Sequence, residues 1–422
     1  MNVLWLTPIQ LPAAKGAPAT TGGWLEGLRQ ALQEHEPDLR LTIASLGSVA
    51  HAPFREGNAE YHWVSPQVHA SRTGRLASRW RSPRVPEGAL AECRRILAET
   101  KPDLVHVHGT DSFLGLALEG TRVPAVVSLQ GIMHACARYV GSGLGPADWL
   151  RASATAQFVH GFGLVHTLRS YRARARTELR VLTLCDAFTG RTDWDRAVLR
   201  ALRPDATYYH DDRILRSAFY DRSWTAPGPD APIFCTAGGS PIKGLETLLD
   251  AVAILRGALG RPVRLRVAGA VRGSDLWPVV KRRLADPRLR SAVDLVGVLD
   301  AAAIASELEQ ASVYVQPSHI DNNANALCEA MLVGLPCVAT FVGGLPSIIR
   351  HADTGLLCQD GEPAMLAQAI DTLLADGALA ARLGRAARDA ALVRHDPQRI
   401  AHEVAGIYRD VVLGSAASDK RG

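Results

Sequence analysis

The sequence lacks the features that define several broad classes of protein. No apolar run approaches the ~20 residues that a membrane-spanning helix needs. The seven cysteines are scattered, odd in number and without a C-x-x-C pair, so we predict neither a disulfide framework nor a zinc ribbon, and a reducing cytoplasm fits. The N-terminus, Met1 to Leu6, has no basic start and no cleavage site, so we expect a first strand rather than a signal peptide.

The chain also lacks a strong excess of either charge. Its formal net charge is +5, and it contains no nucleic-acid-binding motif, so we reject nucleic acid as the main partner. Arginine is nevertheless concentrated in two runs beside aromatic residues. These favour peripheral contact with an anionic membrane or a lipid diphosphate acceptor, and a solvated helix face is an equal alternative for each. The runs are Arg72, Arg75, Arg79, Arg81 and Arg84, and Arg169, Arg172, Arg174, Arg176 and Arg180.

What is present is the composition of a globular protein of more than one domain. The chain has 422 residues, of which 47% are apolar and 21% charged. The segment from Trp224 to Pro232 holds three prolines and one glycine and predicts an interdomain linker. We therefore expect an N-terminal domain over residues 1–222, a linker over 223–232 and a C-terminal domain over 233–396.

One segment of the C-terminal domain shows a clear order of elements. Ala311–Gln316 predicts a buried strand, which a polar loop with three asparagines follows. Apolar residues recur at helical spacing from Asn325, and Gly334 with the proline after it predicts the end of that helix. Cys337–Thr340 predicts another strand. The loop therefore lies at the carboxyl end of a strand in a βαβ unit, where open α/β sheets bind ligands.

The chemistry of this loop suits an anion that also carries hydroxyl groups. Free amides at a helix start attract phosphate oxygens, and Asn322, Asn323 or Asn325 could cap the helix. Asp321 and Glu329 flank those amides, and a carboxylate accepts hydrogen bonds from sugar hydroxyls. A nucleotide sugar combines both groups. The alternative is that the loop only caps the helix and that Glu329 is a solvated helix residue.

The same residues resemble the signature of a known enzyme family. Asp321 and Glu329 are eight residues apart and are followed by Ala-Met and a Gly-x-Pro turn, which resembles the E-x7-E motif of retaining family 4 glycosyltransferases with Asp as the first acid. Asn322–Ala330 resembles an N-x-x-N-x-L-x-E-A subgroup. The resemblance implies the GT-B fold, with two doubly wound Rossmann-like domains facing across a cleft and a last helix, from about Pro397, returning to the N-terminal domain.

A lysine loop supports the resemblance in part. Lys243 lies beside glycines ahead of a predicted helix, which is a suitable phosphate contact. It resembles the lysine of the family's G-R-x-x-x-x-K-G segment. The family's arginine has no match, since Gly238 or Gly239 stands near its place.

Two glycine pairs resemble family loops that approach the donor. Gly22-Gly23 follows the first predicted strand, where absent side chains let a ligand approach the backbone. Gly343-Gly344 resembles a Gly-Gly-x-Pro-Glu loop that wraps the donor sugar, with Ser347 in place of the acid. All four glycines are therefore expected in the donor site.

The N-terminal domain carries residues that the resemblance assigns to the acceptor side. Gln130 occupies the place of a histidine beside the reacting sugar, and His134 is a partial substitute. His106 and His108 share one face of a predicted strand, but no third metal ligand is evident and the family needs no divalent ion. We expect His106 to be packed in the core and His108 to line the cleft.

A further arginine is a candidate for the missing donor cation. Gly190–Asp195 resembles a GRT-x-WD stretch of the same subgroup. Because it follows an apolar segment, Arg191 is expected to reach the cleft, and pairing with Asp193 in a loop is the alternative.

The resemblance implies a metal-independent retaining hexosyltransferase without a cofactor. Its donor is a UDP- or GDP-linked sugar, and its acceptor is a glycan or lipid-linked molecule in cytoplasmic polysaccharide assembly. Glu329 would bind the ribose, Asp321 the sugar hydroxyls and Lys243 the diphosphate. The helix-start residues expected at the diphosphate are Asn325, Ala326 and Leu327, and the residues expected to be catalytic are Lys243, Asp321 and Gln130. The alternatives are a GT-B epimerase or phosphorylase, or a catalytically silent protein that binds a glycan or partner.

Overall fold

The computed structural model describes residues 1–11, 23–47, 52–65, 85–153, 158, 163–228 and 230–419, with side chains to Ser415. The chain divides into two compact units. Unit 1 consists of Met1–Ala135, Ser170–Ile214 and His395–Gly422, and unit 2 consists of Cys136–Arg169 and Leu215–Arg394. The expected N-terminal domain over 1–222 is therefore wrong in two respects. Cys136–Arg169 belongs to unit 2, and so does Leu215–Arg394, which includes the predicted linker over 223–232.

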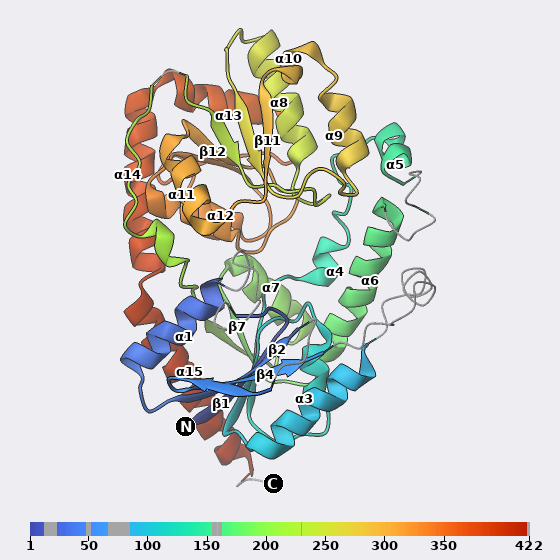
Figure 1. Ribbon diagram of the computed structural model, residues 1–422, viewed down its shortest axis with the longest axis vertical. Helices are drawn as coiled ribbons and strands as arrows, with labels where there is room; N and C mark the ends of the chain where they lie inside the picture. The colour runs from blue at the N-terminus through green and yellow to red at the C-terminus, as the bar shows by residue number, and fades with distance from the viewer. Residues whose placement is uncertain are drawn as a thin grey trace. The chain divides into compact units, whose positions relative to one another are not determined.

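Unit 1 is built on an eight-stranded sheet in the order β3-β4-β2-β1-β5-β6-β7-β8 (Figure 1). All neighbouring pairs are parallel except β3 with β4. The strands are β1 (Asn2–Thr7), β2 (Arg40–Leu46), β3 (Phe54–Glu56), β4 (Ala59–Val64), β5 (Leu104–Val107), β6 (Ala125–Ser128), β7 (Ala187–Gly190) and β8 (Thr207–His210). The main helices are α1 (Gly23–His35), α3 (Glu87–Thr100), η1 (Phe113–Leu118), α4 (Met133–Cys136), α6 (Leu164–Val181), α7 (Asp193–Leu202) and α15 (Pro397–Asp419).

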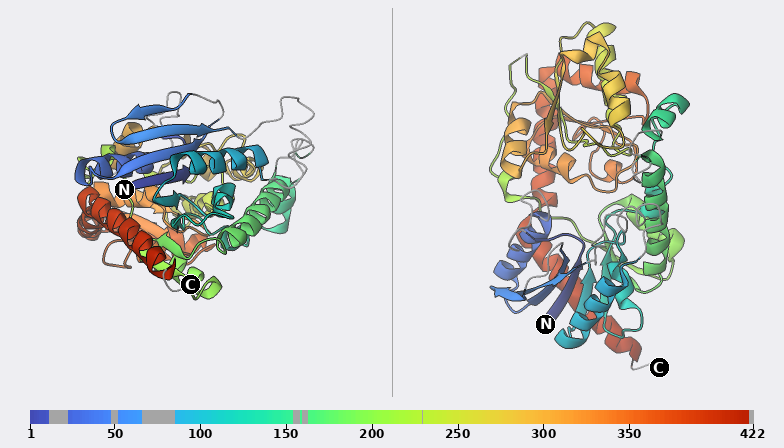
Figure 2. Two further views of the ribbon diagram at one scale, coloured as in Figure 1. Left: turned by 90° about the horizontal axis from the view of Figure 1, so that it is seen from below. Right: turned by 45° about the vertical axis from the view of Figure 1, so that its right-hand side comes forward.

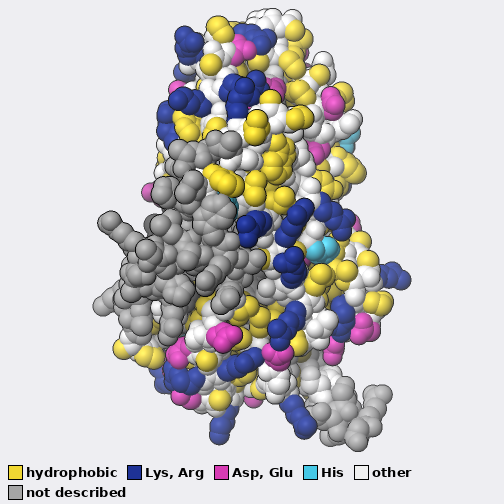
Figure 3. All heavy atoms as spheres, turned by 90° about the vertical axis from the view of Figure 1, so that its right-hand side faces the viewer, with side chains coloured by type: hydrophobic (Ala, Val, Ile, Leu, Met, Phe, Trp, Pro, Cys, Tyr) yellow, Lys and Arg dark blue, Asp and Glu magenta, His cyan; other side chains and the backbone are white. Residues whose placement is uncertain are grey.

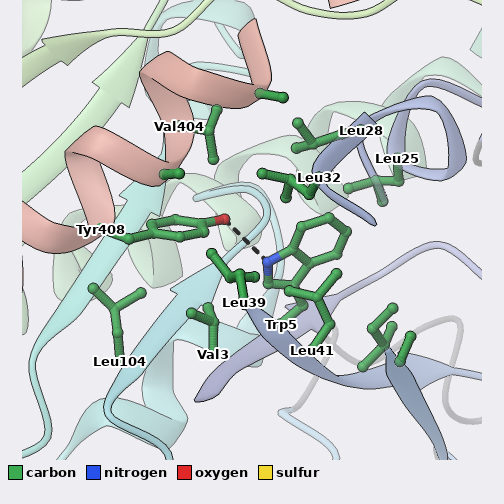
Figure 4. Close-up of a cluster of buried hydrophobic side chains, with 14 of the residues drawn as sticks. Val3, Trp5, Leu25, Leu28, Leu32, Leu39, Leu41, Leu104, Val404 and Tyr408 are labelled. Carbon is green, nitrogen blue, oxygen red and sulfur yellow. Dashed lines mark hydrogen bonds between the residues drawn. The ribbon is translucent and has the colours of Figure 1, made fainter. Parts of the chain in front are cut away.

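The last helix, α15, is part of the core of unit 1. It lies along one face of the sheet beside α1 (Figure 2) and contributes Val404 and Tyr408 to the cluster around β1 (Figure 4). The indole Nε1 of Trp5 donates to the Tyr408 hydroxyl at 3.0 Å. The central strand β1 is buried on both faces, as parallel strands covered by helices are, which accounts for its nearly continuous apolar sequence.

Unit 2 is built on a six-stranded, wholly parallel sheet in the order β11-β10-β9-β12-β13-β14. Its strands are β9 (Ile233–Cys235), β10 (Leu265–Ala268), β11 (Val293–Gly297), β12 (Val313–Gln316), β13 (Cys337–Thr340) and β14 (Leu356–Cys358). Its helices are α5 (Pro146–Ser153), η3 (Ser217–Phe219), α8 (Leu245–Gly257), α9 (Trp277–Arg283), α10 (Pro287–Arg290), α11 (Ala301–Gln310), α12 (Asn325–Val333), η4 (Leu345–Ser347), α13 (Pro363–Ala375) and α14 (Gly377–Arg394).

Each sheet has one point at which the direction of strand addition reverses. In unit 1 it lies between β1 and β5, and in unit 2 between β9 and β12. Loops at the carboxyl ends of two such strands diverge to opposite faces of the sheet and leave a crevice that binds ligands in doubly wound folds. The residues that follow β9 and β12, and those that follow β1 and β5, are therefore the first places to look for a site.

Two findings on single elements complete the fold. The strand at β13 and the helix stop at Gly334 are confirmed, since Gly334 ends α12 with φ 89°. No single helix among the described residues is both long and apolar enough to cross a membrane. One sharply bent pair of helical segments, Pro363–Ala375 and Gly377–Ser415, has the necessary length and composition only when the two are taken together.

Candidate functional site

The loops that follow β9 and β12 touch each other at the reversal point of the second sheet. The backbone N–H of His319 donates to the carbonyl of Ile242 at 2.9 Å. Gly244 has φ 66°, and a Cβ at that position would lie 1.8 Å from the carbonyl oxygen of Pro317. Only glycine allows so close an approach in this conformation. The contact brings the lysine loop and the acidic loop together.

Lys243 and Asp321 form an ion pair at this junction. The lysine Nζ lies 2.5 Å from Oδ2 of Asp321, and the two side chains are 29% and 11% exposed. The same carboxylate oxygen accepts from the Ser318 hydroxyl at 3.3 Å and from the Gln316 amide at 3.4 Å. The acid is thus held by several donors, while the lysine stays partly open to solvent.

A buried chain of hydrogen bonds lies beneath the ion pair. The Tyr314 hydroxyl donates to the Gln316 carbonyl oxygen at 2.8 Å and shares a 2.7 Å hydrogen bond with Thr236. Burial raises the pKa of Tyr314 well above its usual value, so it remains a neutral hydroxyl. The chain connects β9 to β12 and fixes the side chain that faces Asp321.

Helix α12 begins at this point. Its N-cap residue is Ala324, whose side chain makes no cap hydrogen bond. The N-cap position is therefore held by an alanine and not by one of the three asparagines that were candidates for it. The first amides of a helix have no partner within it, and they carry the positive end of the helix dipole. Those of Asn325, Ala326 and Leu327 belong to this turn.

The glycine pair after β13 packs on the same acidic loop. The N–H of Gly344 donates to the carbonyl of Asp321 at 2.9 Å. Gly343 has φ 50°, and a Cβ there would lie 2.1 Å from that carbonyl oxygen. The structure therefore brings Lys243, Asp321, Gly343 and Gly344 together.

Glu329 has a partner that the sequence analysis missed. Arg216 donates to both of its carboxylate oxygens, from Nε at 2.7 Å and from Nη2 at 2.8 Å. Burial raises the pKa of Glu329, and the Arg216 guanidinium opposes that rise. Glu329 is 3% exposed, so the alternative of a solvated helix residue is wrong. The only feature of the sequence that pointed to this pairing was the position of an arginine, Arg216, shortly before the predicted linker.

The two glycines near the place of the absent family arginine differ in the space around them. A Cβ on Gly239 would lie 2.1 Å from the side chain of Ser274, whereas a Cβ on Gly238, which has φ 56°, would have no atom within 4 Å. The loop after β10 thus fills the space that a larger residue at position 239 would need.

The corresponding edge of unit 1 is dominated by buried imidazoles. His106 shares hydrogen bonds of 2.7 Å with the Tyr408 hydroxyl and with the Ser128 hydroxyl, as expected of a core residue. His108 is 1% exposed and packs against Trp5 at a ring distance of 4.6 Å. Neither of its ring nitrogens has a hydrogen-bond partner in the part of the chain that the structure describes. The prediction that His108 lines an open wall is wrong, because aromatic packing encloses it.

Burial also sets the protonation of this pair. It lowers the pKa of His106 to about 3, with a smaller contribution from Arg191. It lowers the pKa of His108 well below its usual value, and His106 adds to the effect. Both imidazoles are therefore neutral at pH 7.

Gln130 lies on the loop after β6 and His134 lies in the short helix α4 that follows, and an acid that was not predicted holds the start of this helix. Glu178 of α6 accepts from the N–H of Met133 at 3.0 Å and from the N–H of His134 at 2.9 Å, and its Oε2 also lies 2.9 Å from Nδ1 of His134. The Thr110 hydroxyl after β5 donates to the same carboxylate at 3.0 Å. Glu178 is the one acid in the sequence of α6, which is otherwise basic, and this contrast could have marked it as a candidate from the sequence.

Arg191 does not lie where the sequence analysis expected it. It is 2% exposed, and its Nη1 donates to the carbonyl of Leu129 at 3.1 Å inside unit 1. Burial lowers the pKa of Arg191, while Asp211 and Asp195 oppose that change. Its assignment as a donor-binding cation is therefore wrong, because the guanidinium is enclosed in the core.

Parts of the predicted site lie outside the described residues, namely Gly22 and the arginine run from Arg72 to Arg84. Gly23 is described and is the first residue of α1.

The second arginine run lies on α6. Arg174 donates to the Asp111 carboxylate at 2.7 Å, and Arg180 lies 2.5 Å from Glu119. Figure 3 shows the side of the molecule that holds α6, where Lys and Arg side chains outnumber the acidic ones.

Comparisons with solved structures identify the fold. Solved structures of similar fold include sucrose-phosphate synthase from Thermosynechococcus elongatus, with a TM-score of 0.73 at 20% identity over 98% of this chain and 99% of that one. Another is HepE of Anabaena in complex with UDP-glucose, with a TM-score of 0.65 at 17% identity over 97% of this chain and 100% of that one. The chain thus has the GT-B fold, which confirms the predicted fold class.

The sequence comparisons define the class of the second unit more closely. Residues 219–390 match the family model described as glycosyl transferases group 1. A D-inositol 3-phosphate glycosyltransferase of Pseudarthrobacter chlorophenolicus is 34% identical over 149 residues, 35% of each chain. The N-acetyl-alpha-D-glucosaminyl L-malate synthase of Bacillus anthracis is 38% identical over 86 residues, 20% of this chain and 23% of that one. The aligned stretches thus span about a quarter to a third of these two relatives.

Proposed function

We propose that the chain is a retaining, metal-independent family 4 glycosyltransferase that transfers a hexose from a nucleotide-diphosphate sugar. The observation that carries this proposal is the Lys243–Asp321 ion pair at the reversal point of the second sheet, beside the start of α12. A cation and helix amides suit a diphosphate, and the carboxylates suit hydroxyl groups. The match of residues 219–390 to the glycosyl transferases group 1 model supports it.

In this proposal each part of the donor has its own partner in unit 2. Lys243 and the first amides of α12 stabilise the diphosphate as the bond to the sugar breaks. Asp321 and the loop at Gly343 and Gly344 hold the sugar hydroxyls. Glu329 binds the ribose, and Arg216 orients its carboxylate through two hydrogen bonds. A carboxylate fixed at both oxygens by one guanidinium presents its remaining lone pairs in a constant direction.

The chemistry needs electrostatic stabilisation rather than a pair of acid and base carboxylates. Charge grows on the diphosphate as it leaves, and one well-placed donor in a preorganised site contributes about 3–4 kcal/mol. The leaving phosphate would take the proton of the attacking hydroxyl. That proton then resides on the released nucleotide, and the sugar keeps the configuration of its anomeric carbon.

Unit 1 would hold the acceptor, a glycan or a lipid-linked molecule in polysaccharide assembly. Gln130 and His134 are polar side chains on the loop after β6 and in α4, and Glu178 fixes the start of that helix. These groups suit neutral hydroxyls. The exposed arginines of α6 would contact an anionic membrane surface on the cytoplasmic side.

Calorimetric titration with UDP and with GDP tests the donor site. Lys243→Ala should weaken binding of the preferred nucleotide by about ten- to a hundredfold, since a hydrogen bond to a charged group contributes about 1.5–3 kcal/mol. Lys281→Ala, which removes an exposed lysine of α9, is the matched control and should bind as the wild type does. Equal affinity of Lys243→Ala and the wild type would refute the site.

Product analysis separates transfer from the alternative activities. Incubation with a nucleotide sugar should release free sugar slowly without an acceptor, as glycosyltransferases do when water replaces the acceptor. An epimerised nucleotide sugar, a dependence on free phosphate, or no turnover at all would each contradict the proposal.

A further inference from the structure

A buried histidine joins the elements that carry the proposed donor site. His319 lies directly after Ser318, whose hydroxyl donates to Asp321. Its ring Nε2 lies 2.5 Å from the Glu246 carboxylate, and its Nδ1 lies 2.7 Å from the Asp360 carboxylate. Glu246 lies in the first turn of α8, just after Lys243, and Asp360 follows β14. One ring therefore connects three segments of unit 2.

The geometry requires this ring to be positively charged. A neutral imidazole has one N–H and one bare nitrogen, so it donates to only one of two carboxylates. The ring is fully buried, and two carboxylates without a cation between them repel each other in a medium of low polarity. Burial by itself lowers the pKa of His319, but the hydrogen bonds to Asp360 and Glu246 outweigh it and raise the pKa to about 9.

The backbone leaves no space for this group to move. A Cβ on Gly143 would lie 2.4 Å from the Glu246 carboxylate and 2.6 Å from Nε2 of His319. The N–H of His319 also donates to the carbonyl before Lys243, as described above. The histidine thus holds the lysine loop and the acidic loop at a fixed separation.

We propose that His319 is a positioning residue, which in its charged form holds Lys243 and Asp321 in register for the nucleotide diphosphate. The inference rests on the proposed function, because it concerns the same donor. When the ring loses its proton, the cluster with Glu246 and Asp360 changes from one net negative charge to two. The loops then separate, and the added charge repels the diphosphate, so donor affinity falls.

The alkaline dependence of nucleotide affinity tests this role. The wild type should lose affinity for its preferred nucleotide, UDP or GDP, as the pH rises through about 9. Asp360→Asn removes one of the two negative charges beside the ring but keeps an oxygen that can accept its N–H, and Asp360 is 24% exposed, so the fold should tolerate the change. We expect the loss of affinity to begin roughly one pH unit lower in this variant, because one of the two carboxylates that favour the charged ring is gone. Asp353→Asn, at an exposed ion pair with Arg350, is the matched control and should leave the profile unchanged.

The same set of variants distinguishes the titration of His319 from that of other groups near the ring. The charged groups around it are Glu246, Asp360 and, beside Glu246, Asp250, and the Cys358 thiol has a pKa raised to about 12 by burial and by Asp360. Lys243 also loses its charge at high pH, but Asp360→Asn should not move that step. His319→Gln, which cannot titrate, should bind more weakly at neutral pH and show no step near pH 9.

Two results would overturn the proposal. One is an alkaline step at the same pH in the wild type and Asp360→Asn, and the other is a step that persists in His319→Gln. If no variant bound either nucleotide, the proposed function would fail, and hydrogen exchange would still decide the positioning role. Amides of residues 240–244 and 317–324 should then exchange several-fold faster in Asp360→Asn than in Asp353→Asn, and equal rates would overturn it.

Discussion

The two units share a doubly wound sheet but differ in the charge at their carboxyl edges. In unit 1 the carboxyl end of β5 carries two neutral imidazoles, His106 within the strand and His108 after it, which contact tryptophan and tyrosine rings. In unit 2 the residues after β9 and β12 form ion pairs, Lys243 with Asp321 and His319 with two carboxylates. The difference teaches that one fold supports an edge suited to hydroxyl groups and an edge suited to an anion.

The contrast is sharpest between His106 and His319, two buried histidines with opposite pKa shifts. His106 has hydroxyl partners, so burial dominates and lowers its pKa to about 3. His319 has carboxylate partners, which raise its pKa to about 9. A lowered pKa costs stability as the pH falls below about 6.5, and a raised pKa costs stability as the pH rises from about 6.5 to 9. The two units should therefore weaken in opposite directions of pH.

The largest expected effect comes from breaking the buried ion pair of unit 2. Arg216→Ala leaves the Glu329 carboxylate enclosed without its cation, and the free energy of unfolding of unit 2 should fall by about 3–5 kcal/mol. Arg350→Ala is the matched control, since its pair with Asp353 is 64% and 55% exposed, and it should cost at most about 1 kcal/mol. Urea unfolding of both variants measures the difference, and equal costs would show that the pair contributes no more than a surface contact.

The next effect concerns the neutral histidine of unit 1. Between pH 7 and pH 5, His106 becomes protonated in the unfolded state but stays neutral in the folded state. The free energy of unfolding of unit 1 should therefore fall by about 2 kcal/mol because of this group. His106→Gln should reduce that loss, whereas His402→Gln, at a half-exposed histidine of α15, should not. Hydrogen exchange of the β5 and β6 amides at the two pH values measures it. A pH response in His106→Gln equal to that of the wild type would show that His106 is not the neutral group.

A smaller effect is expected where α15 joins unit 1. Tyr408→Phe removes the hydroxyl that bonds Trp5 and His106, and it leaves the Trp5 N–H without its acceptor, at a cost of about 1–3 kcal/mol. Tyr209→Phe, on the half-buried edge strand β8, is the control and should be nearly neutral. Thermal unfolding compares them, and a neutral Tyr408→Phe would mean that the apolar packing alone holds α15.

The smallest effect concerns the exposed arginines of α6. Arg172 and Arg176 are both exposed on this helix. The double substitution to alanine should weaken the free energy of binding to anionic vesicles by about 1 kcal/mol per arginine, which co-sedimentation measures. Arg200→Ala, on α7, is a control for net charge. Unchanged vesicle binding would assign the arginines to an ordinary solvated face.

The sequence predicted the parts of this structure that depend on local pattern. The alternation of short apolar strands and helices predicted a βαβ unit with a ligand loop, and the resemblance of Asp321 and Glu329 to the E-x7-E motif implied the GT-B fold. The two loops meet because their strands flank one reversal point, which is a property of the topology. The helix end at Gly334 and the strand β13 could also be predicted, because both depend on the residues of their own segment.

The sequence did not reveal pairings between distant residues. Arg216 lies 113 positions from Glu329, and His319 lies 73 from Glu246, so neither pair has a local signal. The burial of His108 and Arg191 was missed for a related reason, since tertiary packing decides whether a polar residue at a strand end is open or enclosed. The assignment of Cys136–Arg169 to unit 2 likewise has no indication in the sequence.

The central claim is that a nucleotide diphosphate binds between Lys243 and the start of α12. A crystal structure with bound UDP, or GDP if calorimetry favours it, tests this most directly. We expect the diphosphate oxygens within about 3 Å of Lys243 Nζ and of the Ala326 and Leu327 amides, with the ribose at Glu329. A nucleotide bound away from the loops that follow β9 and β12 would contradict the claim.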